Sequence, residues 1–234
     1  MDVLAANYGV WKLQEAYDAW AYAVTDLDQN GRLELISTEM HGTGHYTTTA
    51  IWEINPSLTG LILCGRDRSC DLDILDRLAA EGGPQSCGLI ISLMYSSDGP
   101  MAYPVYYDAD ADLYRYVVQD TVTPKIDWYE MSVQHSFALR NSRISGRLLT
   151  YEADNFSIGQ QGFWDQGGNF ISEEAYQTLV EAPYPDLPPM QASILWISDQ
   201  HLGEFTEAER YALLKNSMES FQIQAAAADI ESHH

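Results

Sequence analysis

Residues 22–36 read YAVTDLDQNGRLELI and organise the N-terminal part of the chain. The first four residues include aromatic and β-branched side chains, which favours a short strand. After the polar stretch, the apolar residues Leu33 and Leu35 alternate with charged residues. An alternation of period two predicts a half-buried strand rather than a helix. The sequence therefore predicts two strands joined by an acidic, glycine-containing loop.

Outward from this stretch, apolar spacing predicts helices on both sides of a strand-rich middle. We expect the helices near residues 8–20, 71–82, 172–182 and 206–222. Thr206, with Glu209 three residues later, predicts a capping box at the start of the last of these helices. We expect the strands near residues 22–25, 35–41, 45–54, 61–64, 102–107, 113–119, 126–138, 143–152 and 193–197. The alanine run at 225–228 either extends the last helix or frays.

This order of elements predicts an α+β fold: an antiparallel β-sheet system with an N-terminal helix and C-terminal helices. The chain has 234 residues, which fits a single α+β domain over 1–234. A C-terminal helical subdomain over 190–234 is the alternative division.

The composition excludes several classes of partner. The chain has 12 Lys+Arg against 34 Asp+Glu, a formal net charge of −22. This charge opposes binding to nucleic acid and to anionic lipid, because both are negatively charged. A hydrophobic fraction of 46% argues against disorder. The sequence also lacks the apolar run of about 18 residues that membrane insertion requires.

The most specific motif lies in the acidic loop, as Asp26-x-Asp28-x-Asn30-Gly31-Arg32-x-Glu34. Alternating oxygen-bearing side chains in a tight loop can converge on a hard cation such as calcium, which takes six to eight oxygen ligands. Arg32 would offer its backbone carbonyl, and Glu34 would close the site directly or through a water molecule. The loop is not an EF-hand, because Ser37 stands where that motif has a glutamate. The alternative is a turn of the same residues without an ion.

The motif resembles the DxDxDGxxD/E calcium loop of FG-GAP and VCBS-type repeats, in which a strand also leads out of the loop. The wider context is similar to uncharacterised secreted or lipid-anchored bacterial proteins that carry one such loop after an N-terminal helix. A tyrosine-rich segment at 104–116 and the run Glu173-Glu174-Ala175-Tyr176 add to this likeness. The resemblance implies calcium binding outside the cell and brings no enzymatic activity with it.

Two further groups of residues are weaker metal candidates. Asp108, Asp110 and Asp112 alternate, which is typical of a solvated hairpin tip and less often of a second cation site. His41 and His45 flank Gly42-Thr43-Gly44, a predicted hairpin connection, and with Glu39 they could form a transition-metal site or act as acid–base groups. Structural or exposed histidines are the simpler interpretation, and it also applies to His135 and His201.

The three cysteines are Cys64, Cys70 and Cys87, and their spacing matches no zinc motif. We interpret them as ordinary thiols. In an extracellular protein, Cys64 and Cys70 are the pair that could form a disulfide.

The sequence contains no nucleophile elbow and no phosphate-binding glycine loop. Residues 1–7 do not form an intact signal peptide, so the chain is either cytosolic or a mature segment without its leader. The leading hypothesis is a non-catalytic, extracellular or cell-surface module that calcium stabilises and that binds a protein or a saccharide. The alternatives are a hydrolase acting on extracellular polymers and a cytosolic structural or interaction protein.

Overall fold

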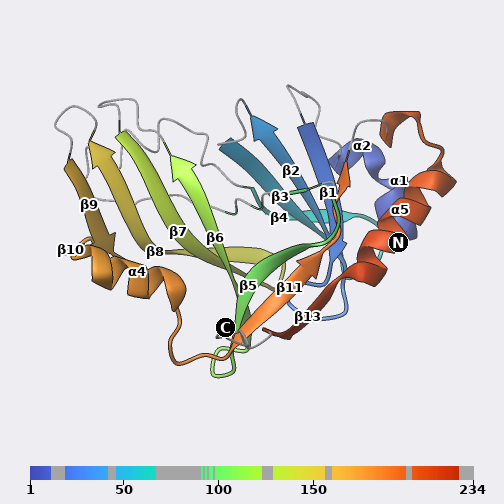
Figure 1. Ribbon diagram of the computed structural model, residues 1–234. Helices are drawn as coiled ribbons and strands as arrows, with labels where there is room; N and C mark the ends of the chain where they lie inside the picture. Colours follow the sequence, from blue (N-terminus) through green and yellow to red (C-terminus); the bar gives the residue numbers. More distant parts are fainter. Residues whose placement is uncertain are drawn as a thin grey trace, which may run out of the picture.

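The computed structural model describes residues 1–11, 19–41, 46–66, 91, 93, 95–96, 98–122, 129–155, 160–198 and 202–226. Two antiparallel sheets form the body of the molecule, and helices lie at its two ends (Figure 1). This arrangement confirms the predicted α+β class with an antiparallel sheet system, an N-terminal helix and a C-terminal helix.

The smaller sheet has the strand order β12-β1-β2-β3-β4. Its strands are β1 (Ala19–Thr25), β2 (Glu34–His41), β3 (Tyr46–Ile54), β4 (Leu61–Arg66) and β12 (Ile197–Ser198). The acidic loop joins β1 to β2, and Thr25 pairs with Glu34 at its base. Glu34 also pairs with Glu53 of β3, so two glutamates lie directly opposite each other in the sheet.

The larger sheet has the strand order β10-β9-β8-β7-β6-β5-β11-β13. Its strands are β5 (Met101–Asp108), β6 (Leu113–Val122), β7 (Tyr129–Arg140), β8 (Arg143–Asn155), β9 (Gln160–Asp165), β10 (Phe170–Ile171), β11 (Pro189–Ile194) and β13 (Gln222–Ala225). A two-residue turn joins β7 to β8, and both of its residues, Asn141 and Ser142, have positive φ angles of 52° and 58°. Such a turn matches the twist of the strands it connects.

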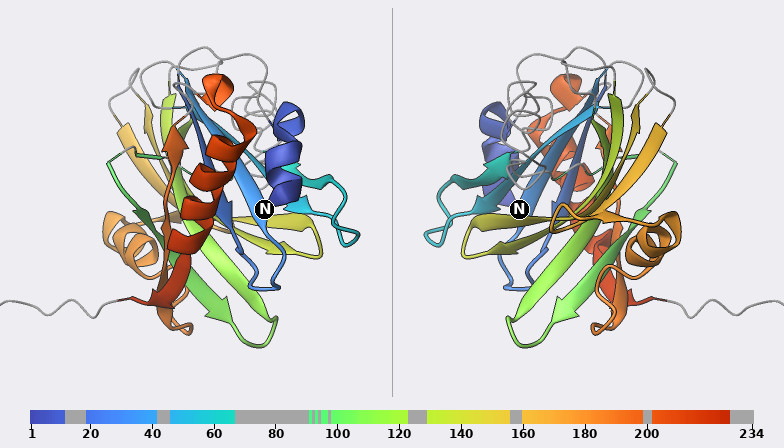
Figure 2. Two further views of the ribbon diagram at one scale, coloured as in Figure 1. Left: turned by 90° about the vertical axis from the view of Figure 1, so that its right-hand side faces the viewer. Right: turned by 90° about the vertical axis from the view of Figure 1, so that its left-hand side faces the viewer.

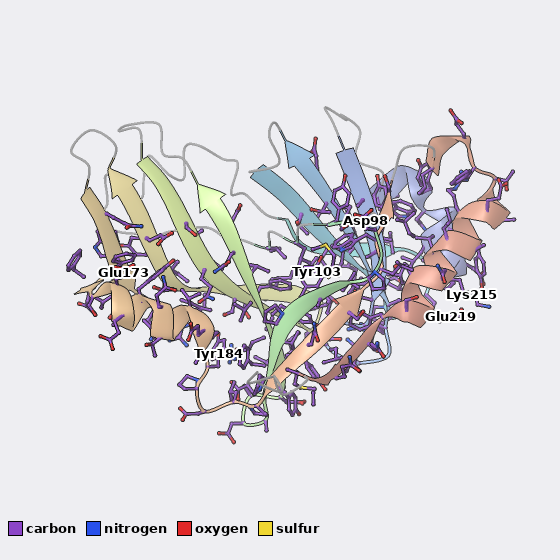
Figure 3. All side chains as sticks on the ribbon, in the orientation of Figure 1. Asp98, Tyr103, Glu173, Tyr184, Lys215 and Glu219 are labelled. Carbon is purple, nitrogen blue, oxygen red and sulfur yellow. The ribbon has the colours of Figure 1, made fainter. Side chains whose placement is uncertain are left out.

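The helices are α1 (Asp2–Ala6), α2 (Tyr8–Trp11), α4 (Glu173–Glu181), the 3-10 turn η2 (Leu202–Glu204) and α5 (Glu207–Ser220). α4 packs on β8 and β9, whereas α5 packs on β1 and α1 (Figure 2). The hydroxyl of buried Ser217 ties α5 to the smaller sheet, because it accepts from the N–H of Val24 at 3.0 Å and donates to the carbonyl of Leu195 at 2.6 Å. Lys215 and Glu219 lie on the outward side of α5 (Figure 3).

One apolar core is shared by the two sheets. It combines smaller-sheet residues such as Ile36 and Ile51 with larger-sheet residues such as Tyr116 and Phe137. A second core, which includes Trp11 and Leu214, lies between the smaller sheet and the helices α1, α2 and α5. Burial of apolar side chains on both faces of the smaller sheet thus holds the strands that carry the acidic loop.

Most of the described elements agree with the sequence predictions. The helices expected near 172–182 and 206–222 are α4 and α5, and α5 begins with the predicted capping box. The strand expected near 193–197 begins earlier, at Pro189, and ends at Ile194. The helix expected near 71–82 lies outside the described residues.

Two predictions at the chain ends are wrong in part. α2 agrees with the helix expected near 8–20 over residues 8–11, and residues 12–18 lie outside the described part of the chain. Positions 19 and 20 belong to β1, where they pair with β2. The C-terminal segment does not extend α5 up to position 225. It forms β13, which pairs with β11, because Phe221 and Ile223 pack against the shared core.

The sequence analysis assigned no strand to β9. Gly162 lies within this strand, where an added Cβ would stand 2.3 Å from the ring of Trp164. The glycine therefore leaves room for the indole ring to lie close to the backbone, and glycine within a strand often marks such a close approach.

Candidate metal centre

The acidic loop is closed at its base by the β1–β2 pairing and shaped by two residues of positive φ. Gln29 has a φ of 56° and Gly31 a φ of 81°. The N–H of Gly31 then donates to both oxygens of Asp26, at 3.3 and 3.1 Å. Glycine adopts this backbone conformation without steric cost, so its place after the third predicted ligand turns the loop back on itself.

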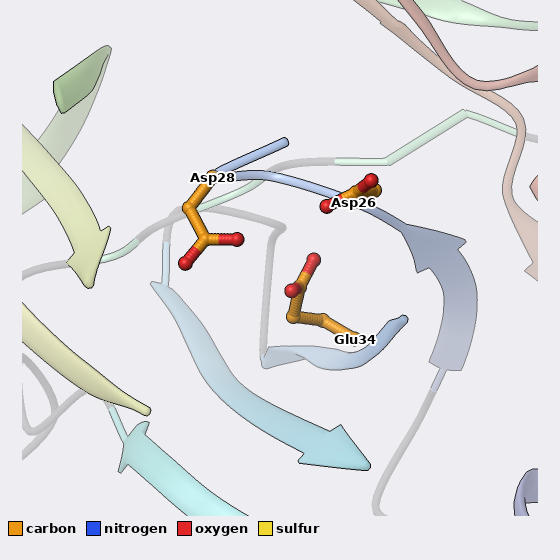
Figure 4. A group of neighbouring side chains, drawn as sticks. All are labelled: Asp26, Asp28 and Glu34. Atoms are coloured by element: carbon orange, nitrogen blue, oxygen red, sulfur yellow. The ribbon is translucent and has the colours of Figure 1, made fainter. Parts of the chain in front are cut away.

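Three of the predicted ligands come together in this loop. One carboxylate oxygen from each of Asp26, Asp28 and Glu34 lies within 4.8 Å of the other two. Asp26 follows β1, Asp28 lies in the loop and Glu34 begins β2. Figure 4 shows the three carboxylates turned toward a common centre. An arrangement of this size is one that a single divalent cation can bridge.

Glu34 is the most constrained of the three acids. Its side chain is fully buried, and Oε2 accepts from the N–H of Leu27 at 2.6 Å and from the hydroxyl of Thr25 at 3.2 Å. Its other oxygen, Oε1, is buried and has no hydrogen-bond partner among the described residues. A buried acceptor without a partner destabilises the folded state, so a cation or a proton bound at this oxygen would be stabilising.

The surroundings of the three acids disfavour their charged forms. Burial raises the pKa of the Glu34 carboxyl well above its ordinary value, against the effect of the Leu27 N–H, and the charge of Asp28 adds to the increase. Burial also raises the pKa of Asp26 and of Asp28, and the charge of Glu53 contributes to both. Neighbouring carboxylates repel each other, and a bound cation would reverse that effect.

A fourth carboxylate, Glu53, lies beside this group, and the sequence analysis missed it. Glu53 is fully buried opposite Glu34 in the β2–β3 pairing. Its Oε1 accepts from Arg32 Nη2 at 2.9 Å and from Asn30 Nδ2 at 3.1 Å, and its Oε2 accepts from the hydroxyl of Ser142. The only sequence signal for it is a glutamate within the otherwise apolar end of a strand, at positions 51–54.

The side chains of Arg32 and Asn30 have partners that the motif did not predict. The guanidinium of Arg32 pairs with Glu53, and the ligand role of the Arg32 carbonyl stays a prediction. Asn30 presents its amino group to Asp28 at 2.8 Å, while its Oδ1 accepts from the backbone N–H of Arg32 at 2.7 Å. Its side chain would therefore ligate a cation only after its amide turned over.

The loop is also fastened to the larger sheet. The hydroxyl of Tyr116, on β6, donates to the carbonyl of Leu27 at 2.8 Å, and the ring of Tyr116 stacks on Phe137 with centroids 5.2 Å apart. Ser142, in the β7–β8 turn, reaches Glu53 from the same sheet. The candidate centre thus lies where the two sheets meet.

Two of the alternating aspartates at the β5–β6 turn accept hydrogen bonds from separate side chains. Asp108 accepts from Arg115 at 3.1 and 2.7 Å, and Asp112 accepts from the hydroxyl of Tyr107 at 2.8 Å. Within the described ranges, Asp108, Asp110 and Asp112 do not form a group with convergent ligand atoms. Their arrangement agrees with the predicted hairpin tip.

Several other predicted residues lie outside the described part of the chain. These residues are His45, Cys70, Cys87 and His201, so both the His41–His45 site with Glu39 and the Cys64–Cys70 pair stay predictions. Cys64 itself is half-buried, and burial raises the pKa of its thiol to about 12. His135 is buried in the larger sheet, and burial lowers its pKa to about 4.

Comparisons with known proteins give no match: no protein family, no curated protein and no solved structure matches this chain. Within its described ranges, the chain has no helix both long enough and apolar enough to cross a membrane.

Proposed function

We propose that this protein is a non-catalytic binding module that a calcium ion in the loop 26–34 stabilises. The observation that carries the proposal is the buried carboxylate of Glu34, whose Oε1 lies without a hydrogen-bond partner among the described residues. The carboxylates of Asp26 and Asp28 complete a group whose ligand atoms lie within 4.8 Å of one another. A cation at this point would satisfy the orphaned oxygen and relieve the repulsion among the three acids.

The donor chemistry favours calcium over other common metals. All three convergent side chains are carboxylates, and oxygen ligands suit hard cations, whereas zinc and copper are usually bound through nitrogen or sulfur. Asp26 and Asp28 are only partly buried, which leaves room for water ligands on their side of the ion. Calcium tolerates such an irregular mixture of protein and water oxygens better than magnesium, which demands a small octahedral shell.

A calcium requirement supports an extracellular or cell-surface location, with the cytoplasm as the alternative. Extracellular modules bind calcium with dissociation constants as weak as about 10⁻⁴–10⁻³ M, and such sites fill only where calcium is abundant. We propose that the ion here is structural and that the loop itself is not the ligand-binding surface.

We propose a protein or a saccharide as the ligand of the module. An aromatic group at the far end of the larger sheet supports this part of the proposal. Tyr151 and Trp164 stack with ring planes 2° apart, and Trp164 contacts Phe170 edge to face. Phe170 is 71% exposed and Trp164 is half-buried, whereas Tyr151 is buried, so Phe170 and Trp164 provide the surface that a ligand could contact. Rigid aromatic side chains of this kind contribute contact area to sugars and peptides at low entropic cost.

Thermal melting in EDTA and in about 1 mM calcium tests the metal proposal. The wild-type protein should melt at a higher temperature with calcium, and isothermal titration should show saturable calcium binding. The Asp26→Asn/Asp28→Asn variant should lose both effects. A matched control, Asp98→Asn/Asp110→Asn, removes two exposed carboxylates and should keep both effects. If the wild type melts at one temperature in both solutions and binds no calcium, the loop is only a turn.

A further inference from the structure

The candidate metal centre contains a charged pair that the calcium motif does not predict. We propose that Arg32 and Glu53 together set the calcium affinity of the loop, with Arg32 weakening it and Glu53 strengthening it. This inference rests on the function proposed above, since it concerns the regulation of the same site. It assigns to the Arg32 side chain a role opposite in sign to that of the carboxylates around it.

The geometry keeps the Arg32–Glu53 pair next to the metal ligands. Glu53 has a fully buried side chain, Arg32 a side chain that is 28% exposed, and the distance between Nη2 and Oε1 is 2.9 Å. Because Glu53 lies directly opposite Glu34 in an antiparallel pair, the two side chains leave the sheet on the same face. Asn30 bridges the groups further, since its amino nitrogen lies 3.1 Å from Glu53 and 2.8 Å from Asp28.

The balance of formal charge follows from these contacts. Three carboxylates converge on the candidate metal position, and Glu53 brings a fourth that the guanidinium of Arg32 neutralises. Without the guanidinium, an incoming calcium ion would meet one more uncompensated negative charge. Without the Glu53 charge, it would meet an unpaired positive one. The low-dielectric surroundings of Glu53 make both differences larger than they would be on an open surface.

The pair can be altered without removing the loop's own hydrogen bonds. The bond that Arg32 makes to Asn30 Oδ1 uses its backbone N–H, so Arg32→Gln leaves it in place. In Glu53→Gln, the amide oxygen can still accept from a neighbour while the charge is gone. A purely structural role for the pair predicts weaker calcium binding in both variants, whereas an electrostatic role predicts opposite shifts.

Calorimetric titration of the chelator-treated full chain with calcium chloride tests the proposal. Arg32→Gln should lower Kd by about three- to tenfold, and Glu53→Gln should raise it by a similar factor, as expected for one charge acting at short range in a partly buried site. The double variant should return to within about twofold of the wild-type Kd, because the two charge changes cancel. Arg32→Lys and the surface control Lys215→Gln should leave Kd within about twofold of the wild type.

The outcomes separate this inference from the proposed function. A wild-type protein that binds no calcium refutes the function itself. A wild type that binds calcium, with Kd raised in both single variants or changed in neither, overturns the role of the pair alone. Arg32→Met is a second neutral variant, should Arg32→Gln not fold in EDTA. The Glu53→Gln result also stands by itself, because a Kd equal to or below that of the wild type contradicts the proposal.

Discussion

Replacing Glu34 with glutamine should have opposite effects on stability without and with calcium. In the wild type, Glu34 Oε2 accepts two hydrogen bonds while Oε1 is buried without a partner among the described residues. In Glu34→Gln, the amide oxygen can keep the two bonds, and the new amino group can donate to the nearby carboxylates of Asp26 and Asp28. At a pH high enough to ionise Glu34, satisfying this buried polar atom is worth about 1–3 kcal/mol, so the variant should be more stable than the wild type in EDTA by that amount.

Calcium should reverse the order of the two proteins. A site with a dissociation constant near ~10 μM stabilises the folded state by about 2.7 kcal/mol in ~1 mM calcium. The variant lacks the buried anionic ligand and should gain little of this free energy. For a chain of this size, each 1 kcal/mol corresponds to a change in melting temperature of about 2–4 °C. The melting temperature of the wild type should therefore rise by several degrees on addition of calcium, and that of Glu34→Gln should stay almost unchanged.

Thermal and urea unfolding in EDTA, in calcium and in magnesium measure this reversal in the order of stability of the two proteins. Magnesium should raise the wild-type melting temperature less than calcium does, because of its stricter octahedral geometry. Glu174→Gln is a suitable control, since Glu174 is an exposed residue in the first turn of α4. A Glu34→Gln protein that is less stable than the wild type in EDTA, or an equal gain from calcium in both proteins, would contradict this role of Glu34.

Three further predictions concern parts of the fold that support the loop. Ser217→Ala should lower the free energy of unfolding by about 1–3 kcal/mol, because a buried N–H and a partly buried carbonyl both lose their partner. Ser220→Ala, which removes a solvent-exposed bond within α5, should change it little, and equal effects in urea unfolding would contradict this. Tyr116→Phe should lower the free energy of unfolding by about 1–2 kcal/mol, because the carbonyl of Leu27 in the loop loses its hydrogen bond. Tyr107→Phe, in an exposed hairpin, should change it little, and an unchanged urea midpoint for Tyr116→Phe would contradict the stabilising role of the Tyr116 bond. Burial lowers the pKa of His135 to about 4, so the unfolded chain takes up a proton near pH 6.5 that the folded chain resists, and this residue should lower the free energy of unfolding as the pH falls from 6.5 toward 4. His135→Leu should flatten that part of the urea-derived pH profile, and an identical slope in both proteins would contradict the assignment.

The sequence predicted the elements whose pattern is local. The capping box that opens α5 depends on residues three positions apart, Thr206 and Glu209, and the structure shows both of its hydrogen bonds. The strands β5 to β8 follow alternating patterns separated by turn residues, and they lie close to their expected places. Local chemistry of this kind needs no knowledge of the rest of the fold.

The failed predictions depend on contacts between distant segments. The spacing before residue 20 is helical, yet residues 19 and 20 pair with β2. The residues after α5 have helix-forming neighbours, yet β13 forms because Phe221 and Ile223 reach the shared core. Propensity is a weak guide in such places, because tertiary packing provides more free energy than the local preference.

The candidate centre shows the same division between local and long-range information. Asp26, Asp28 and Glu34 belong to one loop, and their spacing alone identified them. The position of Glu53 beside these acids depends on the register between β2 and β3. A hairpin connection of three residues, 42–44, would place position 52 opposite Glu34, whereas the observed pairing of His41 with Tyr46 leaves four residues between the strands and places Glu53 there. A shift of one residue moves a side chain to the other face of the sheet, so the fourth carboxylate and its partner Arg32 became visible only once the register was known.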